Sequence, residues 1–149
     1  MPEKTCPFCL VDVKKNPIIY ENYILFVTPS NPWLVPGHTL IIPKRHVAEP
    51  FLLGRRERIE FMEVAFRFQQ KLSELFSARW GTRASCDLQI LPKPFMEQTA
   101  LAITGHTHAH LLPRGYKDHL WRVSGYLTDE AFKNPSRGEL DDFVASLSD

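Results

Sequence analysis

Three histidines in one short segment constrain the fold of this chain more than any other feature. His106, His108 and His110 stand two residues apart, among small and apolar residues that favour a β-strand. Successive side chains of a strand point to opposite faces, so the three imidazoles are predicted to line one face and the residues between them to face the core. Burying a row of unpaired imidazoles costs free energy, and the row therefore indicates a shared chemical role.

A plainer interpretation of this row is a solvated strand that happens to be rich in histidine, or a patch that chelates metal incidentally. A lone histidine is usually of that kind. Here the spacing is regular and the segment is apolar, ending in Leu112-Pro113-Arg114. These two features favour a functional row over an incidental one.

The composition is typical of one globular domain without a strong charge. The chain has 149 residues, with 18 basic and 17 acidic side chains. No shift in composition along the sequence marks a domain boundary. A net charge near zero gives no electrostatic reason to expect a nucleic acid or a membrane as partner. The N-terminal segment lacks the apolar stretch of a secretory signal, and the apolar runs are too short to span a bilayer, so a cytoplasmic protein is expected.

Short apolar runs flank one long amphipathic segment. The runs predict strands over residues 18–21, 23–28, 39–42, 88–91 and 101–112, the last as one or two strands. Between them, a helix is predicted from Arg55 to about Ala78. This order predicts the α+β class, with a mainly antiparallel sheet and the long helix packed on one face.

The helical segments are predicted from periodicity and from their ends. Within the long segment, apolar residues recur near a 3.6-residue period at Ile59, Met62, Phe66, Leu72 and Phe76. Gly81 is expected to end this helix. Ser136-Arg-Gly-Glu139 has the pattern of a capping box and predicts a short C-terminal helix after it.

A pair of cysteines, Cys6-x-x-Cys9, is compatible with half of a zinc site, a redox dithiol or a chance occurrence. A redox dithiol sits after a buried strand at a helix N-terminus, and the five residues before Cys6 are too few to be expected to form such a strand. Zinc would need two further ligands from elsewhere in the fold. The third cysteine, Cys86, has no partner at metal spacing and is expected to be a small buried hydrophobe.

The sequence resembles the histidine-triad (HIT) family of nucleotide-binding enzymes. The His-x-His-x-His motif followed by two apolar residues matches the signature of that family. Tyr20-Glu21, the block from Pro36 to His46 and the Leu-Pro-Arg after the triad also follow the order of the family's landmarks. The resemblance covers most of residues 6–116. It implies a single HIT domain over residues 1–149, in which residues 117–149 form a C-terminal extension.

The resemblance implies a catalytic role for two of the histidines. The central histidine of the family is the nucleophile, which places that role on His108 and implies a covalent nucleotidyl-histidine intermediate. A neutral imidazole can attack phosphorus at neutral pH without a strong base. The third histidine, His110, is then expected to donate a hydrogen bond to the non-bridging phosphate oxygens.

The resemblance also supplies the two missing metal ligands. Several relatives carry the N-terminal cysteine pair and complete a zinc tetrahedron with two histidines, at positions that correspond to His46 and His106. The expected zinc ion is structural and is held by Cys6, Cys9, His46 and His106. It would join the N-terminal segment to the strand that carries His108.

The residues that hold the nucleotide follow less directly from the family pattern. Asn31 stands near the position of the family's ribose-binding acid, and Asp87 near that of a strand asparagine, although Asp87 is equally compatible with a strand-edge role. The family's Gly-Gln-Ser/Thr segment is displaced here: either an insertion separates it from the triad, or Thr104 and Gly105 take its place, with Thr104 as the expected phosphate contact. Arg114 is expected to offer a bidentate fork to an outer phosphate. His38 is interpreted as a structural histidine.

The implied function is cleavage of a nucleoside phosphate linkage in a purine nucleotide. Dinucleoside polyphosphates and nucleoside phosphoramidates are the two candidate substrate classes, and the Pro-Arg after the triad favours the first. A nucleotide-binding module with little turnover is the alternative, because the ribose and phosphate positions depart from the family pattern. By resemblance alone, a homodimer is expected.

Overall fold

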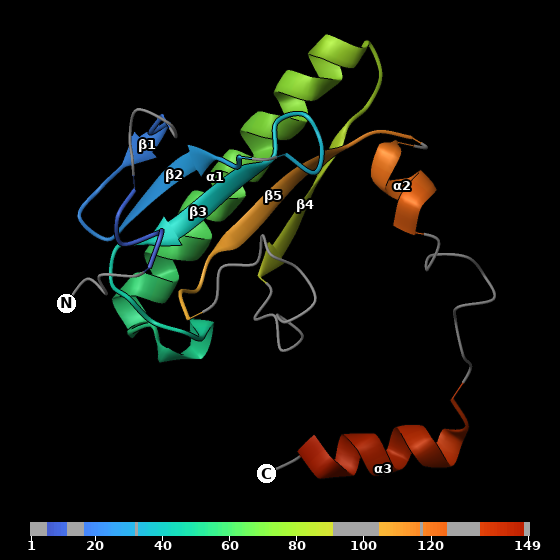
Figure 1. The fold of residues 1–149 in the computed structure, drawn as a ribbon. Helices are drawn as coiled ribbons and strands as arrows, with labels where there is room; N and C mark the ends of the chain where they lie inside the picture. The colour runs from blue at the N-terminus through green and yellow to red at the C-terminus, as the bar shows by residue number, and fades with distance from the viewer. Residues whose placement is uncertain are drawn as a thin grey trace. The chain divides into compact units, whose positions relative to one another are not determined.

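The computed structural model describes residues 6–11, 17–31, 33–90, 105–116, 118–124 and 135–147. The chain divides into two compact units, Met1–Tyr116 and Lys117–Asp149. The first unit contains a sheet and one long helix (Figure 1). Within its described residues, the second contains two short helices.

The first unit is built on a five-stranded antiparallel sheet with the strand order β1-β2-β3-β5-β4. Its strands are β1 (Tyr20–Glu21), β2 (Leu25–Pro29), β3 (Thr39–Pro43), β4 (Ser85–Ile90) and β5 (Ala109–Arg114). The predicted α+β class with an antiparallel sheet is therefore confirmed. The strand bounds differ from those predicted, and β4 begins three residues earlier than expected.

Helix α1 (Arg55–Trp80) covers one face of the sheet (Figure 1). It starts after Gly54 and ends at Gly81, whose φ of 65° lies in the left-handed region that favours glycine. The buried positions of α1 are Phe61, Val64, Ala65, Phe68, Leu72 and Phe76. The face predicted from the sequence is wrong at Ile59 and Phe66, which are 53% and 55% exposed. Apolar residues stand on both sides of this helix, so periodicity alone did not identify the buried side.

Alternation along the strands separates two faces of the sheet. Ala109, Leu111 and Cys86 belong to the core cluster that α1 covers. On the other face, Phe26, Leu40 and Ile42 form a second cluster, on which Phe8, Val11 and Ile18 pack. His110 pairs with Leu40 on one side and Gln89 on the other, so these three side chains share that second face.

The second unit contains α2 (His119–Ser124) and α3 (Arg137–Leu147). The predicted capping box at the start of α3 is confirmed. The backbone N–H of Glu139 donates to Oγ of Ser136 at 3.2 Å, and the N–H of Ser136 donates to Oε2 of Glu139 at 2.7 Å.

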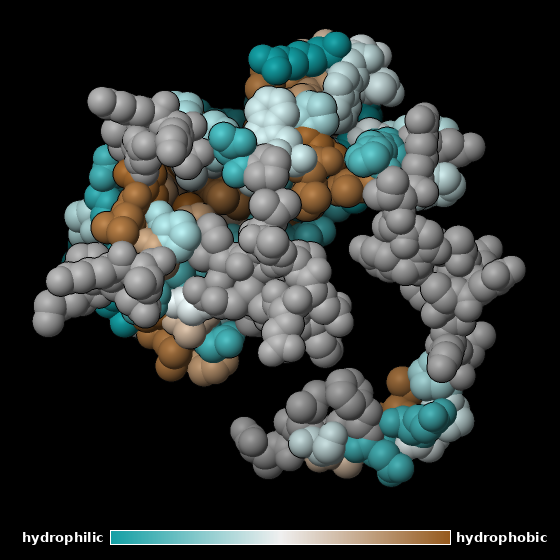
Figure 2. Space-filling model, viewed as in Figure 1, coloured by the Kyte–Doolittle hydropathy of each residue, from teal (hydrophilic) through white to brown (hydrophobic). Residues whose placement is uncertain are grey.

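Apolar side chains are also exposed on the first unit. The short 3-10 helix η1 (Pro50–Leu52) exposes Phe51 and Leu52, and brown surface lies over it in Figure 2.

Among the described helices, none combines the length and apolar character that a membrane crossing requires.

Candidate active site and metal centre

The three histidines of the triad lie at the start of β5 and not within one strand as predicted. The β3–β5 ladder ends at the pair Ile41 and Ala109, so of the three only His110 belongs to β5. In the same register Thr107 would lie opposite Pro43, which has no N–H to donate. The N–H of Thr107 instead donates to the backbone oxygen of Val47 at 2.7 Å. The chain thus leaves the sheet before Ala109, which gives each histidine a different environment.

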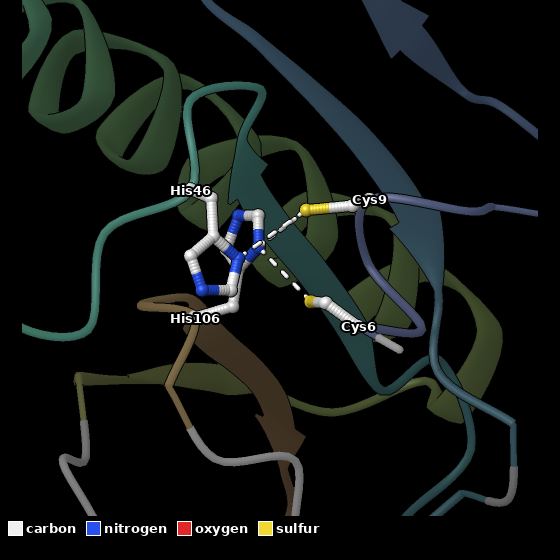
Figure 3. Close-up of side chains that lie close together, drawn as sticks. All are labelled: Cys6, Cys9, His46 and His106. Carbon is white, nitrogen blue, oxygen red and sulfur yellow. Dashed lines mark hydrogen bonds between the residues drawn. The ribbon is translucent and has the colours of Figure 1, made fainter. Parts of the chain in front are cut away.

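Four side chains that were predicted as metal ligands lie together at one end of the sheet. Cys6 and Cys9 come from the N-terminal turn, His46 from the loop after β3, and His106 from the segment before β5 (Figure 3). Their ligand atoms all lie within 4.8 Å of one another. The structure therefore brings all four predicted metal-ligating residues together.

The geometry of this cluster fits a tetrahedral ion. The distance from Sγ of Cys6 to Nδ1 of His106 is 3.3 Å, and Sγ of Cys9 lies 3.3 Å from Nδ1 of His46 and 3.6 Å from Nδ1 of His106. Bond lengths of about 2.3 Å to sulfur and about 2.0 Å to nitrogen place those atoms about 3.5 Å apart in a tetrahedral zinc site. Two thiols and two imidazoles, at these separations, are a donor set that could hold a metal ion.

The ring of His106 is oriented so that Nδ1 faces the two thiols. Its Nε2 lies 2.7 Å from the backbone oxygen of Pro43, and because a carbonyl oxygen only accepts, Nε2 carries the proton. Burial lowers the pKa of His106, which favours the neutral ring with its lone pair on Nδ1. A histidine that binds a metal through one ring nitrogen commonly donates the N–H of its other nitrogen to such a backbone carbonyl.

The ring of His108 is held through the backbone of its neighbour. Nδ1 of His108 lies 2.9 Å from the backbone oxygen of His106 and donates to it. In the neutral ring, this hydrogen bond leaves the lone pair on Nε2. The ring centroids of His108 and His110 lie 4.7 Å apart, so the two imidazoles are direct neighbours.

His110 is connected to a fourth histidine. Nε2 of His38 lies 2.8 Å from Nδ1 of His110, and the N–H of Leu34 donates to Nδ1 of His38 at 3.2 Å. Since the amide can only donate, Nδ1 of His38 accepts, and the proton of the neutral His38 ring is on Nε2. That proton is donated to Nδ1 of His110, which leaves the neutral His110 ring with its own proton on Nε2. The sequence did not indicate this link, although a hydrogen-bonded His38 agrees with its interpretation as a structural histidine.

The four predicted nucleotide contacts lie in different places. Asn31 is exposed in the β2–β3 connection, whose ends meet where the N–H of Ser30 donates to the oxygen of His38. Asp87 and Arg114 form an ion pair of 2.8 Å across β4 and β5. Each of the two side chains thus already has one charged partner. Thr104 lies outside the described residues.

Gln89 is a neighbour of the triad that sequence reasoning did not single out. It stands directly across from His110 in the β4–β5 ladder, on the sheet face opposite α1. An amide in this position has both donors and an acceptor for a phosphate or hydroxyl group near His110. Gln89 follows Asp87 by two residues, so alternation already placed both on one face. Only the β4–β5 register, which the sequence did not give, shows that Gln89 is the neighbour of His110.

The chain belongs to the HIT domain family, whose family model matches residues 12–117. This match covers more than two thirds of the 149 residues and includes the triad, His38, His46 and Gln89. No curated protein sequence matches the chain.

Solved structures share the fold at low sequence identity. A hypothetical protein from Leishmania major is 16% identical with a TM-score of 0.69, over 95% of this chain and 92% of that one. The histidine triad nucleotide-binding protein of Candida albicans is 16% identical with a TM-score of 0.61, over 96% and 94% of the two chains. The diadenosine triphosphate hydrolase of Plasmodium falciparum is 20% identical with a TM-score of 0.51, over 68% and 63%.

Proposed function

We propose that this chain is a HIT-type nucleotide hydrolase or nucleotidyl transferase that acts through a nucleotidyl-histidine intermediate on His108. The observation that carries the proposal is the hydrogen bond from Nδ1 of His108 to the backbone oxygen of His106. This bond selects the tautomer whose lone pair is on Nε2. A nitrogen in that state attacks phosphorus without first having to lose a proton.

In the proposed reaction, Nε2 of His108 attacks the phosphorus next to the nucleoside. The bond from nitrogen to phosphorus forms while the bond to the leaving phosphate or amine breaks. Water then attacks the same phosphorus, which releases the mononucleotide and restores the imidazole. His110 carries its proton on Nε2 in the neutral state, so it can donate to a non-bridging oxygen as negative charge develops there.

Two substrate classes fit this chemistry, namely dinucleoside polyphosphates and nucleoside phosphoramidates of a purine nucleotide. Arg114 favours the polyphosphate class, because its guanidinium lies on the same sheet face as His110 and could pair with an outer phosphate on leaving Asp87. The fold shared with a diadenosine triphosphate hydrolase is compatible with this choice.

The test is a panel of dinucleoside polyphosphates and adenylated amines, with the histidine variants compared in parallel. His108→Ala should abolish turnover and leave the nucleotide affinity nearly unchanged, because the residue acts in the covalent step. His110→Ala should slow turnover while a nucleotidyl adduct still forms, as detected by intact-protein mass spectrometry. Full activity of His108→Ala, or no turnover of either class by the wild type, would refute the proposal.

The alternative function is a nucleotide-binding module with little turnover. The ion pair between Asp87 and Arg114 favours it, because it occupies part of the hydrogen-bonding capacity that either side chain could offer to a nucleotide. Tight binding of adenosine monophosphate without any adduct on His108 would support this alternative over the enzyme.

The Cys/His cluster is proposed to hold a structural zinc ion through Cys6, Cys9, His46 and His106. Four protein donors fill a tetrahedral shell and leave no open position for a substrate. When bound, such an ion contributes to folding stability on the order of 10 kcal/mol in small metal-dependent domains, and less is expected here because the sheet and α1 have their own core.

Metal analysis of the purified protein tests the zinc proposal. The wild type should contain about one zinc ion per chain, and Cys6→Ser should lose both the ion and thermal stability. Cys86→Ala is the matched control, because it removes a thiol from the α1 face of the sheet and not from the cluster. A zinc-free wild type, or an unchanged melting temperature after zinc removal, would contradict the proposal.

A homodimer is proposed from the family resemblance, and one surface supports it. Strand β4 is at the edge of the described sheet, and beside it a groove of about 540 Å³ runs along α1. Phe66, which is 55% exposed, lines this groove. Light scattering should give twice the mass of one chain, and Phe66→Glu should shift it toward the monomer.

A further inference from the structure

Phe8 lies between the two cysteines of the metal cluster and touches the histidine predicted to be the nucleophile. The ring centroids of Phe8 and His108 are 4.8 Å apart with an interplanar angle of 71°. Phe8 also meets the ring of His106 edge-on, at 5.7 Å and 89°. Both separations lie in the range in which aromatic rings attract one another. One side chain thus contacts a predicted metal ligand and the predicted nucleophile.

The hydrogen bond from Nδ1 of His108 to the oxygen of His106 does not by itself fix the tilt of the His108 ring. The bond from Nδ1 to the oxygen of His106 determines which nitrogen carries the proton. The second side-chain torsion of histidine has a broad potential, however, so the ring can still rotate about its bond to Cβ. Contacts on the faces and edges of the ring must define the direction of Nε2. Phe8 and His110 are two such contacts, with ring centroids 4.8 and 4.7 Å from that of His108.

The position of Phe8 depends on the two cysteines around it. The N–H of Cys9 donates to the oxygen of Cys6 at 3.1 Å and closes a turn around Phe8. The side chain of Phe8 also packs on the cluster of Phe26, Leu40 and Ile42. When both thiolates are bound to one ion, the backbone on either side of Phe8 is fixed, and its ring is held against His108.

We infer that Phe8 is a positioning residue, which transmits the state of the Cys6–Cys9 metal turn to the ring of His108. The inference rests on the proposed role of His108 as nucleophile. Phe8 does not react. It limits the rotation of the imidazole, so that Nε2 points toward the substrate as long as the turn is held by the ion. Displacing a nucleophile by up to about 1 Å can lower the reaction rate by up to about 100-fold.

The experiment compares the zinc-loaded wild type with Phe8→Ala, Phe8→Tyr and Phe8→Leu. Phe8→Ala should keep its zinc and lower kcat by about 10- to 100-fold with a much smaller change in KM. Phe8→Tyr should recover most of kcat, because it restores the ring, whereas Phe8→Leu restores apolar volume alone and should recover less. Val11→Ala is the control for packing, since Val11 contacts the same apolar cluster as Phe8.

A second readout does not depend on turnover. In protein with ¹⁵N-labelled histidine, the His108 signals, identified by their absence in His108→Gln, should show one tautomer in the wild type and exchange broadening in Phe8→Ala. Chelation of zinc should cause the same broadening, and chelation should add little to the loss of kcat in Phe8→Ala. The inference would be overturned if Phe8→Ala left the His108 signals and kcat unchanged. It would also be overturned if zinc chelation and Phe8→Ala lowered kcat in a fully additive way. If the wild type has no activity, the proposed function fails, and the spectra still decide the role of Phe8.

Discussion

Replacing Gly37 with alanine tests whether α1 fixes the loop that carries His38. A Cβ atom at Gly37 would lie well inside van der Waals contact with Cε2 and Cζ of Phe76, and 3.1 Å from Cγ of Pro113. The backbone of Gly37 also has a φ of 82°, which an L side chain rarely adopts. The backbone strain costs about 1–2 kcal/mol and the overpacking about 1–3 kcal/mol. The free energy of unfolding should therefore fall by about 2–5 kcal/mol.

Gly81→Ala is the matched control for this experiment. Its φ is 65°, but no heavy atom lies within 4 Å of the added Cβ, so only the backbone strain of about 1–2 kcal/mol remains. Urea denaturation followed by circular dichroism measures both variants. The double variant Gly37→Ala, Phe76→Leu should recover part of the loss, because the smaller side chain leaves room for the methyl group. If Gly37→Ala costs no more than Gly81→Ala, contact with Phe76 is not the reason for glycine.

Three further predictions follow from the titratable groups. Burial raises the pKa of Cys86 to about 12, so an alkylating reagent should leave Cys86 unmodified in the folded protein, as measured by peptide mass spectrometry. Burial also raises the pKa of Cys6, so the proposed zinc ion would have to displace a proton there, and competition with a chelator should show affinity falling at least about tenfold per unit decrease in pH. The hydrogen bond from Arg45 lowers the pKa of Glu57 from its ordinary value of 4.5. The ionised Glu57 therefore stabilises the fold above pH 4.5, and this stabilisation is lost as the pH falls through the lowered pKa. Glu57→Gln should therefore lower the melting temperature at neutral pH, and a difference that persists in strong acid would contradict this.

The class of the fold could be predicted because local patterns specify it. Apolar runs gave the strands, and the long amphipathic segment gave α1 to within two residues of its end. The buried face of α1 was not predictable, because Ile59 and Phe66 are as apolar as the residues that pack on the sheet. The start of β5 also failed, since it depends on where Pro43 ends the neighbouring ladder, and that is a property of two strands together.

The candidate site was predictable where its residues are close in sequence. The spacing of the triad and of the cysteine pair carries chemical meaning on its own. The link between His38 and His110 spans 72 residues, and no local pattern indicates it. Gln89 depends on the register of β4 and β5 in the same way. The tautomers of His106 and His110 depend on tertiary structure, because their hydrogen-bond partners, Pro43 and His38, come from elsewhere in the chain.

The origin of the four cluster residues has a consequence for the order of events during folding. Cys6 and His106 are separated by 100 residues, and Cys9 and His46 by 37. A fully coordinated ion therefore requires that the N-terminal turn and the segment before β5 are already in contact. Its binding is thus a late step of folding, which local structure alone cannot complete. Closing so long a loop carries an entropic penalty that the sheet has to offset first. Nascent chains should accordingly hold an ion only weakly, through at most Cys6, Cys9 and His46, until the segment before β5 has been synthesised. Retention of the ion against a chelator would then report that this unit had folded.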